Sequence, residues 1–275
     1  TKVDDYAYDH AGRLIDHDIT LNGQKEDLVH NRYDELGQLT QKTLGGGLQT
    51  VDYDYNVRGW LRHINDPDAL GDDLFGFELD YGYLYNGNIQ RTYWNTANDN
   101  IKRNYRYNYD GLNRLTYATY YAPGSYWGAY RTWYSYDRNG NIKRLSRTNG
   151  ERIGIDNLTY AYEGNQLQAV TDSYKHSEGF NDGNTKGFDY IYDTNGNLTQ
   201  DKNKGVEMQY NHLNLPLSII KKSENLSYTY DVTGVKHEKI YKNRASTERP
   251  TATIYTPTAV YKNNNLELVF TPEGY

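Results

Sequence analysis

A short motif recurs along this 275-residue chain: two tyrosines with one residue between them, an Asp, and in most copies a Gly three residues after the Asp. Its clear copies begin at Tyr6, Tyr107, Tyr134 and Tyr190, and looser copies begin at Tyr33, Tyr55, Tyr83, Tyr160, Tyr210 and Tyr228. The tyrosine that directly precedes the acidic residue or Asn falls at positions 8, 33, 55, 85, 109, 136, 162, 192, 210 and 230, a mean spacing of about 25 residues. Such spacing is typical of repeat arrays, so the chain is predicted to be a repeat protein.

Each repeat predicts one β-hairpin. Tyrosines at i and i+2 place two rings on the same face of a strand. The Asp at the strand end and the Gly three residues later fit a type I turn closed by a left-handed residue, a common hairpin closure with a bulge. Because an isolated hairpin is barely stable in water, neighbouring hairpins are expected to pair edge to edge in one long antiparallel sheet. An Arg that begins the return strand, such as Arg13 or Arg114, either lies over a tyrosine ring of the adjacent hairpin or is solvated.

The composition fits a thin sheet better than a closed sandwich or barrel. Hydrophobic residues make up 36% of the chain, below the usual share for a globular domain, and 31 residues are tyrosine. Tyrosine can bury its ring while its hydroxyl stays hydrated, so one face of the sheet is expected to be wet or to face a polar cavity. No stretch of the sequence has a useful helical period.

Charge and cysteine content exclude several classes of function. The net charge is −6 and the basic residues are scattered, which argues against nucleic-acid binding. The chain has no cysteine, hence no disulfide or thiolate metal site, and no apolar run approaches the length of a membrane span. Neither end carries a signal peptide or a capping element, so we interpret the sequence as part of a longer polypeptide.

The sequence nominates no catalytic, cofactor-binding or metal-binding residue. The acidic segment Asp66–Asp73 fits part of an EF-hand pattern, but Leu70 and Phe77 stand where ligands are required. An EF-hand is therefore excluded, which leaves a looser calcium site or, as the favoured interpretation, a solvated turn. The seven histidines show no ligand spacing and are expected at the surface. The tyrosine face could bind sugars, but a residue that recurs in register is better explained as packing between hairpins.

The run Tyr8-Asp9-His10-Ala11-Gly12-Arg13-Leu14, with its variants along residues 6–236, resembles the repeats of the YD-repeat or RHS (rearrangement hotspot) family. That family includes bacterial polymorphic toxins, cocoon-forming subunits of toxin complexes, and the teneurins. The resemblance implies a β-sheet that spirals into a hollow shell, which in the toxins encloses a C-terminal effector. It also implies secretion-system components and an immunity protein as partners. The repeats with Asn56, Asn86 and Asn211 in place of Asp are expected to keep the turn.

These observations predict an all-β fold: tandem YD-repeat hairpins in one long, spirally wound antiparallel sheet, part of a hollow RHS shell. Residues 1–236 form the array, and residues 237–275 form a β-rich run-in to an RHS core segment whose signature, including any self-cleaving protease, lies outside this sequence. The predicted role is non-enzymatic, in a secreted or cell-surface bacterial protein that carries a C-terminal effector. A surface adhesin or carbohydrate-binding array is the alternative, and a hydrolase the third reading. The residues predicted to matter are structural, in the repeats: Tyr8, Asp9, Gly12, Tyr33, Gly37, Tyr109, Asp110, Tyr136, Asp137, Gly140, Tyr162, Tyr192, Asp193, Gly196, Tyr230, Asp231 and Gly234.

Overall fold

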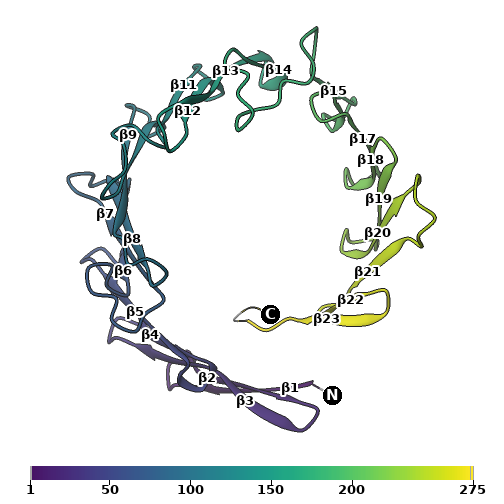
Figure 1. Ribbon diagram of the computed structural model, residues 1–275. Helices are drawn as coiled ribbons and strands as arrows, with labels where there is room; N and C mark the ends of the chain where they lie inside the picture. The colour runs from purple at the N-terminus through teal and green to yellow at the C-terminus, as the bar shows by residue number, and fades with distance from the viewer. Residues whose placement is uncertain (1, 273, 275) are drawn as a thin grey trace. The chain divides into compact units, whose positions relative to one another are not determined.

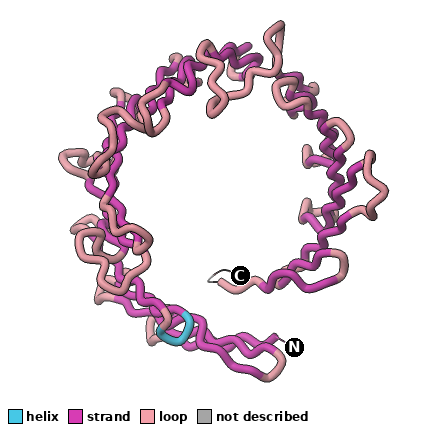
Figure 2. The backbone as a smooth tube through the Cα atoms, viewed as in Figure 1, coloured by secondary structure: helices cyan, strands magenta, loops and turns pink. Residues whose placement is uncertain are grey.

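The computed structural model describes residues 2–272 and 274, and nearly all regular structure in them is β-strand (Figures 1 and 2). The strands form two sheets, one of fourteen and one of nine strands, and each strand lies beside its neighbours in the sequence. The predicted all-β fold of tandem antiparallel hairpins is confirmed. The sheet is divided in two, where the sequence predicted one.

The first sheet contains the strands that precede residue 173: β1 (Lys2–Tyr8), β2 (Leu14–Leu21), β3 (Gln24–Tyr33), β4 (Leu39–Leu44), β5 (Gln49–Tyr55), β6 (Leu61–Ile64), β7 (Phe75–Asp80), β8 (Arg91–Thr96), β9 (Arg103–Tyr109), β10 (Leu115–Tyr121), β11 (Thr132–Tyr136), β12 (Ile142–Thr148), β13 (Gly154–Glu163) and β14 (Gln166–Asp172). A single 3-10 turn, η1 (Gly45–Gly47), joins β4 to β5.

The second sheet contains the later strands: β15 (Tyr190–Tyr192), β16 (Leu198–Asp201), β17 (Val206–Tyr210), β18 (Pro216–Lys221), β19 (Glu224–Tyr230), β20 (Lys236–Asn243), β21 (Thr251–Tyr255), β22 (Ala259–Lys262) and β23 (Asn265–Val269). By compactness the chain divides into two units, residues 1–134 with 147–153, and residues 135–146 with 154–275.

A β-bulge marks the end of the first strand in the repeat hairpins. In β1 the register with β2 shifts between Ala7 and Tyr8, so that Tyr8 lies opposite Leu14. The same shift falls at the tyrosine before the Asp or Asn in seven further hairpins, at Tyr33, Tyr55, Tyr109, Tyr162, Tyr192, Tyr210 and Tyr230. The extra residue lies on the return strand, at Ile15 in the first copy, and the bulge recurs with the motif.

In the repeat at Tyr83-Leu84-Tyr85, the sequence motif predicted the wrong tyrosine at the end of the first strand. β7 pairs with β8 from Phe75 to Asp80, and Tyr83 and Tyr85 lie in the connecting loop with 83% and 71% of their surfaces exposed. Tyr81, directly after β7, occupies the repeat position instead, as its hydrogen bond to Leu61 shows. The loop is longer here than in other repeats, so a pattern with fixed spacing selects a tyrosine too late in the chain.

The break between the sheets coincides with the insertion after the seventh repeat. Residues 173–189 form a long loop between β14 and β15. Asp189, at the end of this loop, forms hydrogen bonds that join β15 to β14. The amide of Asp189 donates to the carbonyl of Gln168 at 2.8 Å, and its carboxylate accepts from the amide of Val170 at 2.7 Å. Asp189 is 1% exposed, so one buried carboxylate stands in for the strand pairing that the insertion interrupts.

Few apolar side chains are fully buried, as the composition predicted. The buried ones are small or aliphatic: Ile19, Val29, Leu70, Ala118, Ala122, Ala129, Leu158, Val170, Ala259 and Val260. Aromatic rings also contact one another along the strands; Tyr105 and Tyr107 of β9, for example, are stacked with their centroids 6.1 Å apart. Because so few apolar side chains are buried, recurrent polar contacts between hairpins contribute to the order of the sheets.

Candidate functional site

The turn of each repeat, here called the YD turn, runs from the Asp or Asn to the residue after the glycine position. In the first copy the amide of Gly12 donates to the carbonyl of Asp9 at 3.0 Å, and the amide of Asp9 donates to the carbonyl of Arg13 at 2.9 Å. Gly12 has φ of +77°, and the predicted glycines Gly37, Gly140, Gly196 and Gly234 have φ between +85° and +94°. All five lie in the region that an L side chain adopts only with strain.

The aspartate side chain closes the YD turn from inside. Oδ1 of Asp9 accepts from the amides of Ala11 and Arg13, both at 2.9 Å, while Oδ2 accepts from Arg13 Nε at 2.6 Å. Asp137 repeats this arrangement, with Asn141 Nδ2 donating to Oδ2 at 2.9 Å. The paired amide contacts to Oδ1 also recur at Asp110, Asp193, Asp231, Asn56 and Asn211. Asn thus forms the same turn as Asp, as predicted for Asn56 and Asn211.

These hydrogen bonds favour the charged carboxylate. Hydrogen bonds from the amides of Arg13 and Arg114 lower the pKa of Asp9 and Asp110, respectively. The side-chain amide of Asn141 lowers the pKa of Asp137. The Thr233 hydroxyl is the main cause that lowers the pKa of Asp231 to about 2. A carboxylate that accepts several hydrogen bonds keeps its charge to lower pH, so the YD turns form an acid-sensitive edge.

The tyrosine before the YD turn connects each hairpin to the one before it. The Tyr33 hydroxyl donates to the backbone carbonyl of Leu14 at 2.9 Å, and Leu14 is the second residue after Gly12 of the preceding turn. The same bond, between 2.7 and 3.0 Å, joins the following pairs: Tyr55 to Leu39, Tyr81 to Leu61, Tyr109 to Ile89, Tyr162 to Ile142, Tyr192 to Leu167, Tyr210 to Leu198 and Tyr230 to Pro216. We call this series the tyrosine ladder.

The predicted residues are thus brought together in pairs of successive repeats. Tyr8 belongs to the first hairpin of the described chain and is 59% exposed, whereas Tyr136 is half-buried at the end of β11. Arg13 lies over the Tyr33 ring of the next hairpin at 4.8 Å, which confirms the predicted stacking for this arginine. The contribution of these residues to stability stays a prediction.

Successive YD turns also contact one another directly. The side-chain amides of Asn195 and Asn197 donate to Asn214 Oδ1 at 3.2 and 2.8 Å. Asn214 occupies the glycine position of the next turn, with φ of +59°. Asn86 and Asn88 donate in the same way to Asn113, and Asn139 and Asn141 to Asn165. At three glycine positions a larger side chain of the preceding turn lies over the glycine: a Cβ would lie 3.3 Å from Arg13 at Gly37, 3.1 Å from Gln38 at Gly59 and 3.2 Å from Leu215 Cδ1 at Gly234.

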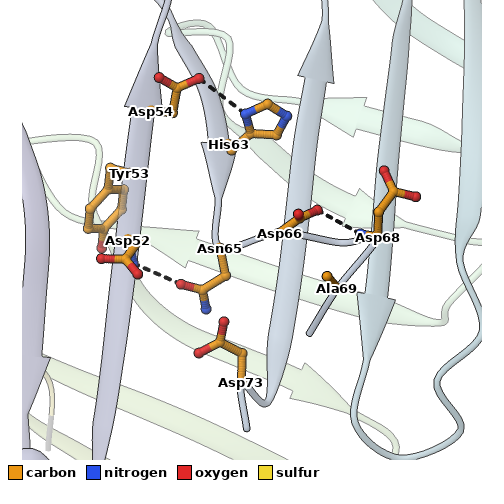
Figure 3. A pocket seen from close by; sticks show the side chains of 9 residues that line it. All are labelled: Asp52, Tyr53, Asp54, His63, Asn65, Asp66, Asp68, Ala69 and Asp73. Carbon is orange, nitrogen blue, oxygen red and sulfur yellow. Dashed lines mark hydrogen bonds and ion pairs between the residues drawn. The ribbon is translucent and has the colours of Figure 1, made fainter. Parts of the chain in front are cut away.

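The acidic loop after β6 borders an open pocket of about 580 Å³ (Figure 3). Pro67 and Leu70 are buried and anchor the loop, whereas the Asp66 and Asp68 side chains are exposed. The turn is therefore only partly solvated. Asp73 is the shielded carboxylate of the pocket: burial raises its pKa, and the negative charge of Asp52 adds to this. Asp68 pairs with Lys102 Nζ at 2.7 Å.

In residues 2–272 and 274, no group of three or more His, Asp or Glu side chains is placed to hold a metal ion. Helices long and apolar enough to cross a bilayer are likewise missing from that part of the chain. The expectation that every histidine is at the surface was wrong for His17, which is fully buried. Its ring stacks on Tyr6 at 4.4 Å and its Nε2 lies 3.0 Å from Asp4 Oδ1, so β1 covers it.

Residues 33–69 match the family model described as RHS Repeat. That segment of the chain is similar to an RHS repeat. The fold of the chain is similar to a Photorhabdus luminescens Tc holotoxin pore carrying a TccC3 mutation, with a TM-score of 0.74 and 18% identity over 96% of this chain and 14% of that one. It is also similar to the TcdB2–TccC3 crystal structure, with a TM-score of 0.73 and 19% identity over 95% of this chain and 14% of that one. Comparison with curated sequences gave no match.

The repeats contain polar residues that the sequence motif did not reveal. At the edge opposite the YD turns, Asn65 Oδ1 accepts from the amide of Asp52 at 2.8 Å, and its Nδ2 donates to the carbonyl of Phe75 at 2.9 Å. Asp172 is buried and accepts from the amide of Asn157 at 2.9 Å. These residues satisfy loop amides and carbonyls, but their spacing varies between repeats. The turn-to-turn asparagines did have a signal, since Asn113 and Asn214 replace the motif glycine.

Proposed function

We propose that this chain is a wall segment of a secreted bacterial RHS shell, which encloses and delivers a C-terminal effector of the same polypeptide. The observation that carries the proposal is the fold, since 96% of the chain superposes on part of a Tc holotoxin pore with a TM-score of 0.74. The chain spans 14% of the length of that protein, so the activity and partners of a whole toxin come to it only by this proposal.

The repeat contacts suit a wall. The tyrosine ladder and the turn-to-turn bonds repeat along the chain and link each hairpin to its predecessor, so further hairpins can be added without a new kind of contact. Residues 1–236 form the repeat array in this proposal, and residues 237–275 lead toward an RHS core segment. Strand β20 is the return strand of the last repeat hairpin, with Lys236 opposite Tyr230, and β21 to β23 continue the meander of the second sheet. The role is non-enzymatic: wall residues pack and enclose.

The test is limited proteolysis with intact-mass spectrometry on the parent polypeptide, extended past Tyr275. The proposal expects a protected C-terminal fragment that stays with the repeats after the connection is cut. The downstream domain expressed alone is the control, because it must be digested under the same conditions for the protection to be due to the repeats. Rapid digestion of the downstream region while the repeats survive would refute the enclosure and leave an open array.

A further inference from the structure

The loop between β10 and β11, residues 122–131, presents three aromatic side chains to solvent. Tyr126, Trp127 and Tyr130 are 58%, 78% and 50% exposed. Single exposed apolar residues are common on protein surfaces, whereas here three exposed rings, which we call the patch, lie within five residues of one loop. Ile153, on the turn that contacts this loop, adds a further exposed side chain. We call residues 122–131 the aromatic loop.

Hydrogen bonds from its base hold the aromatic loop in one conformation. Ser125 Oγ donates to the carbonyl of Ala122 at 2.7 Å and accepts from its amide at 2.9 Å. Thr148 Oγ1 of β12 donates to the carbonyl of Gly128 at 2.7 Å, and Ala129 is completely buried. The rings are therefore exposed on a fixed support, and a ligand that binds them does not have to order the loop first.

Two large residues at the patch have left-handed backbone conformations. Tyr130 has φ of +48° and Arg152 has φ of +69°. Tyr130 is held there from several sides: its amide donates to the carbonyl of Asn149 at 3.1 Å, its carbonyl accepts from the Tyr105 hydroxyl at 3.2 Å, and its ring meets Tyr120 edge-on at 5.2 Å. Strain that the surroundings enforce at an exposed aromatic residue is typical of binding sites.

The facing turn adds polar groups to the rings. The Arg152 guanidinium lies over the Tyr126 ring at 5.2 Å, which places a hydrogen-bond donor at the edge of the patch. Glu151, the preceding residue, is exposed and offers a carboxylate acceptor. The patch thus combines flat apolar surfaces with a donor and an acceptor, and each of these groups is accessible to a ligand.

Size and charge decide which ligand the patch fits. Three rings of roughly 200 Å² each, at these exposed fractions, offer about 400 Å². A stable protein interface needs about 800 Å² on each partner, so the patch is too small to carry one alone. The chain has a net charge of −6 and lacks the basic footprint of a nucleic-acid binder. With a protein partner and a nucleic acid excluded, a small ligand with both apolar faces and hydroxyl groups fits the patch.

We propose that the aromatic loop binds a pyranose oligosaccharide. The C–H faces of the sugar rings stack on Trp127 and Tyr130, while Arg152 and Glu151 form hydrogen bonds with the hydroxyls. The site is independent of the shell function, since it uses none of the YD-turn or ladder residues. An enclosing shell with this site would also attach to a glycan.

Calorimetric titration of the 275-residue chain with short cello-, chito-, malto- and galacto-oligosaccharides tests the proposal, with tryptophan fluorescence as the second readout. We expect saturable binding of at least one series, weakened about tenfold or more by Trp127→Ala because a stacked ring is lost. Tyr85→Ala is the matched control: its ring is 71% exposed and lies 5.6 Å from the Arg58 guanidinium, but on another loop. This control should bind like the parent chain.

The proposal is overturned if no series gives saturable binding, or if Trp127→Ala and Tyr85→Ala lose affinity equally. Because Trp127 is largely exposed, its replacement should leave the far-ultraviolet circular dichroism and the melting temperature unchanged. Should Trp127→Ala nevertheless unfold the chain, Arg152→Ala takes its place, with a loss of affinity expected and unchanged affinity counting against the site.

Discussion

The glycine position of the YD turn has a left-handed backbone conformation, which the hydrogen bonds of the turn hold in place. Gly196 has φ of +86°, and no heavy atom lies within 4 Å of where its Cβ would be. Gly196→Val should therefore destabilise through backbone strain alone, by about 1–3 kcal/mol. The urea midpoint of the purified chain measures this.

Gly111 provides the control for that substitution. It lies in the YD turn after β9, has no left-handed φ, and a Cβ there would also meet no atom within 4 Å. Gly111→Ala should be neutral or slightly stabilising, because it restricts only the unfolded chain. Equal midpoints for Gly196→Val and the parent would show that this position tolerates a side chain and that the hairpin closure is misassigned.

The tyrosine ladder predicts an effect of a single hydroxyl group. Tyr192→Phe removes the donor to the Leu167 carbonyl at 2.7 Å and keeps the ring, so we expect a loss of about 0.5–1.5 kcal/mol. Tyr83→Phe, at an 83% exposed tyrosine of the loop after β7, should cost nothing measurable. If the midpoint changes equally in both variants, the ladder hydrogen bond makes no net contribution to the free energy of unfolding.

At this scale the sequence predicted the turn well and the ladder incompletely. The positive φ of Gly12 and the bonds of Asp9 follow from local turn chemistry, which a motif contains. The acceptor of Tyr33 is a backbone carbonyl of the previous hairpin, and every residue has such a carbonyl. Sequence therefore identified the tyrosines but not their partner. The burial of His17 depends on packing by β1 and had no local signal.

Between elements, some successive YD turns match one another in side-chain size. Asn197 bonds Asn214 at the next glycine position, whereas Leu215 lies over Gly234. Gly234→Asn alone should destabilise, because its Cβ would lie 3.2 Å from Leu215 Cδ1. Adding Leu215→Asn should restore an amide pair, giving a favourable coupling of about 0.5–1 kcal/mol in a double-mutant cycle of urea midpoints. Additive effects would contradict the matching rule.

Elements were predicted where the repeat period held. The hairpins, their antiparallel order and the bulges follow from a motif of nearly constant length. The prediction failed at the long loop after β7, where Tyr81 replaces the expected Tyr85, and at residues 173–189, where the sheet divides. The extension of the seventh repeat at residues 177–184 is visible in the sequence, but its length does not predict that the sheet divides there.

For the whole molecule, the charged YD turns predict sensitivity to acid. Hydrogen bonds lower the folded-state pKa of Asp9, Asp110, Asp137, Asp193 and Asp231, the last to about 2 from an ordinary value of 3.8. A lowered folded pKa contributes stability that is present above the unfolded pKa and is lost as the pH falls through the folded value. The urea midpoint should therefore drop between about pH 4 and pH 2.

Asp231→Asn separates this effect from general acid unfolding. Asn forms the same turn at Asn56 and Asn211, so the variant keeps the hydrogen bonds while removing one titrating group. Its midpoint should fall less steeply below pH 4 than that of the parent chain. A slope identical to the parent would show that the Asp231 carboxylate does not contribute to the acid response.

The tyrosine ladder also has a direction in time. Every donor hydroxyl bonds a carbonyl that lies earlier in the chain, from 12 residues earlier for Tyr210 to 25 for Tyr192. During synthesis the acceptor leaves the ribosome before its donor. Each new hairpin can therefore pair with a strand that is already present, and it needs no residue that is still to be synthesised. Growth from the N-terminus can therefore proceed one hairpin at a time, which keeps the exposed strand edge of the nascent sheet short-lived.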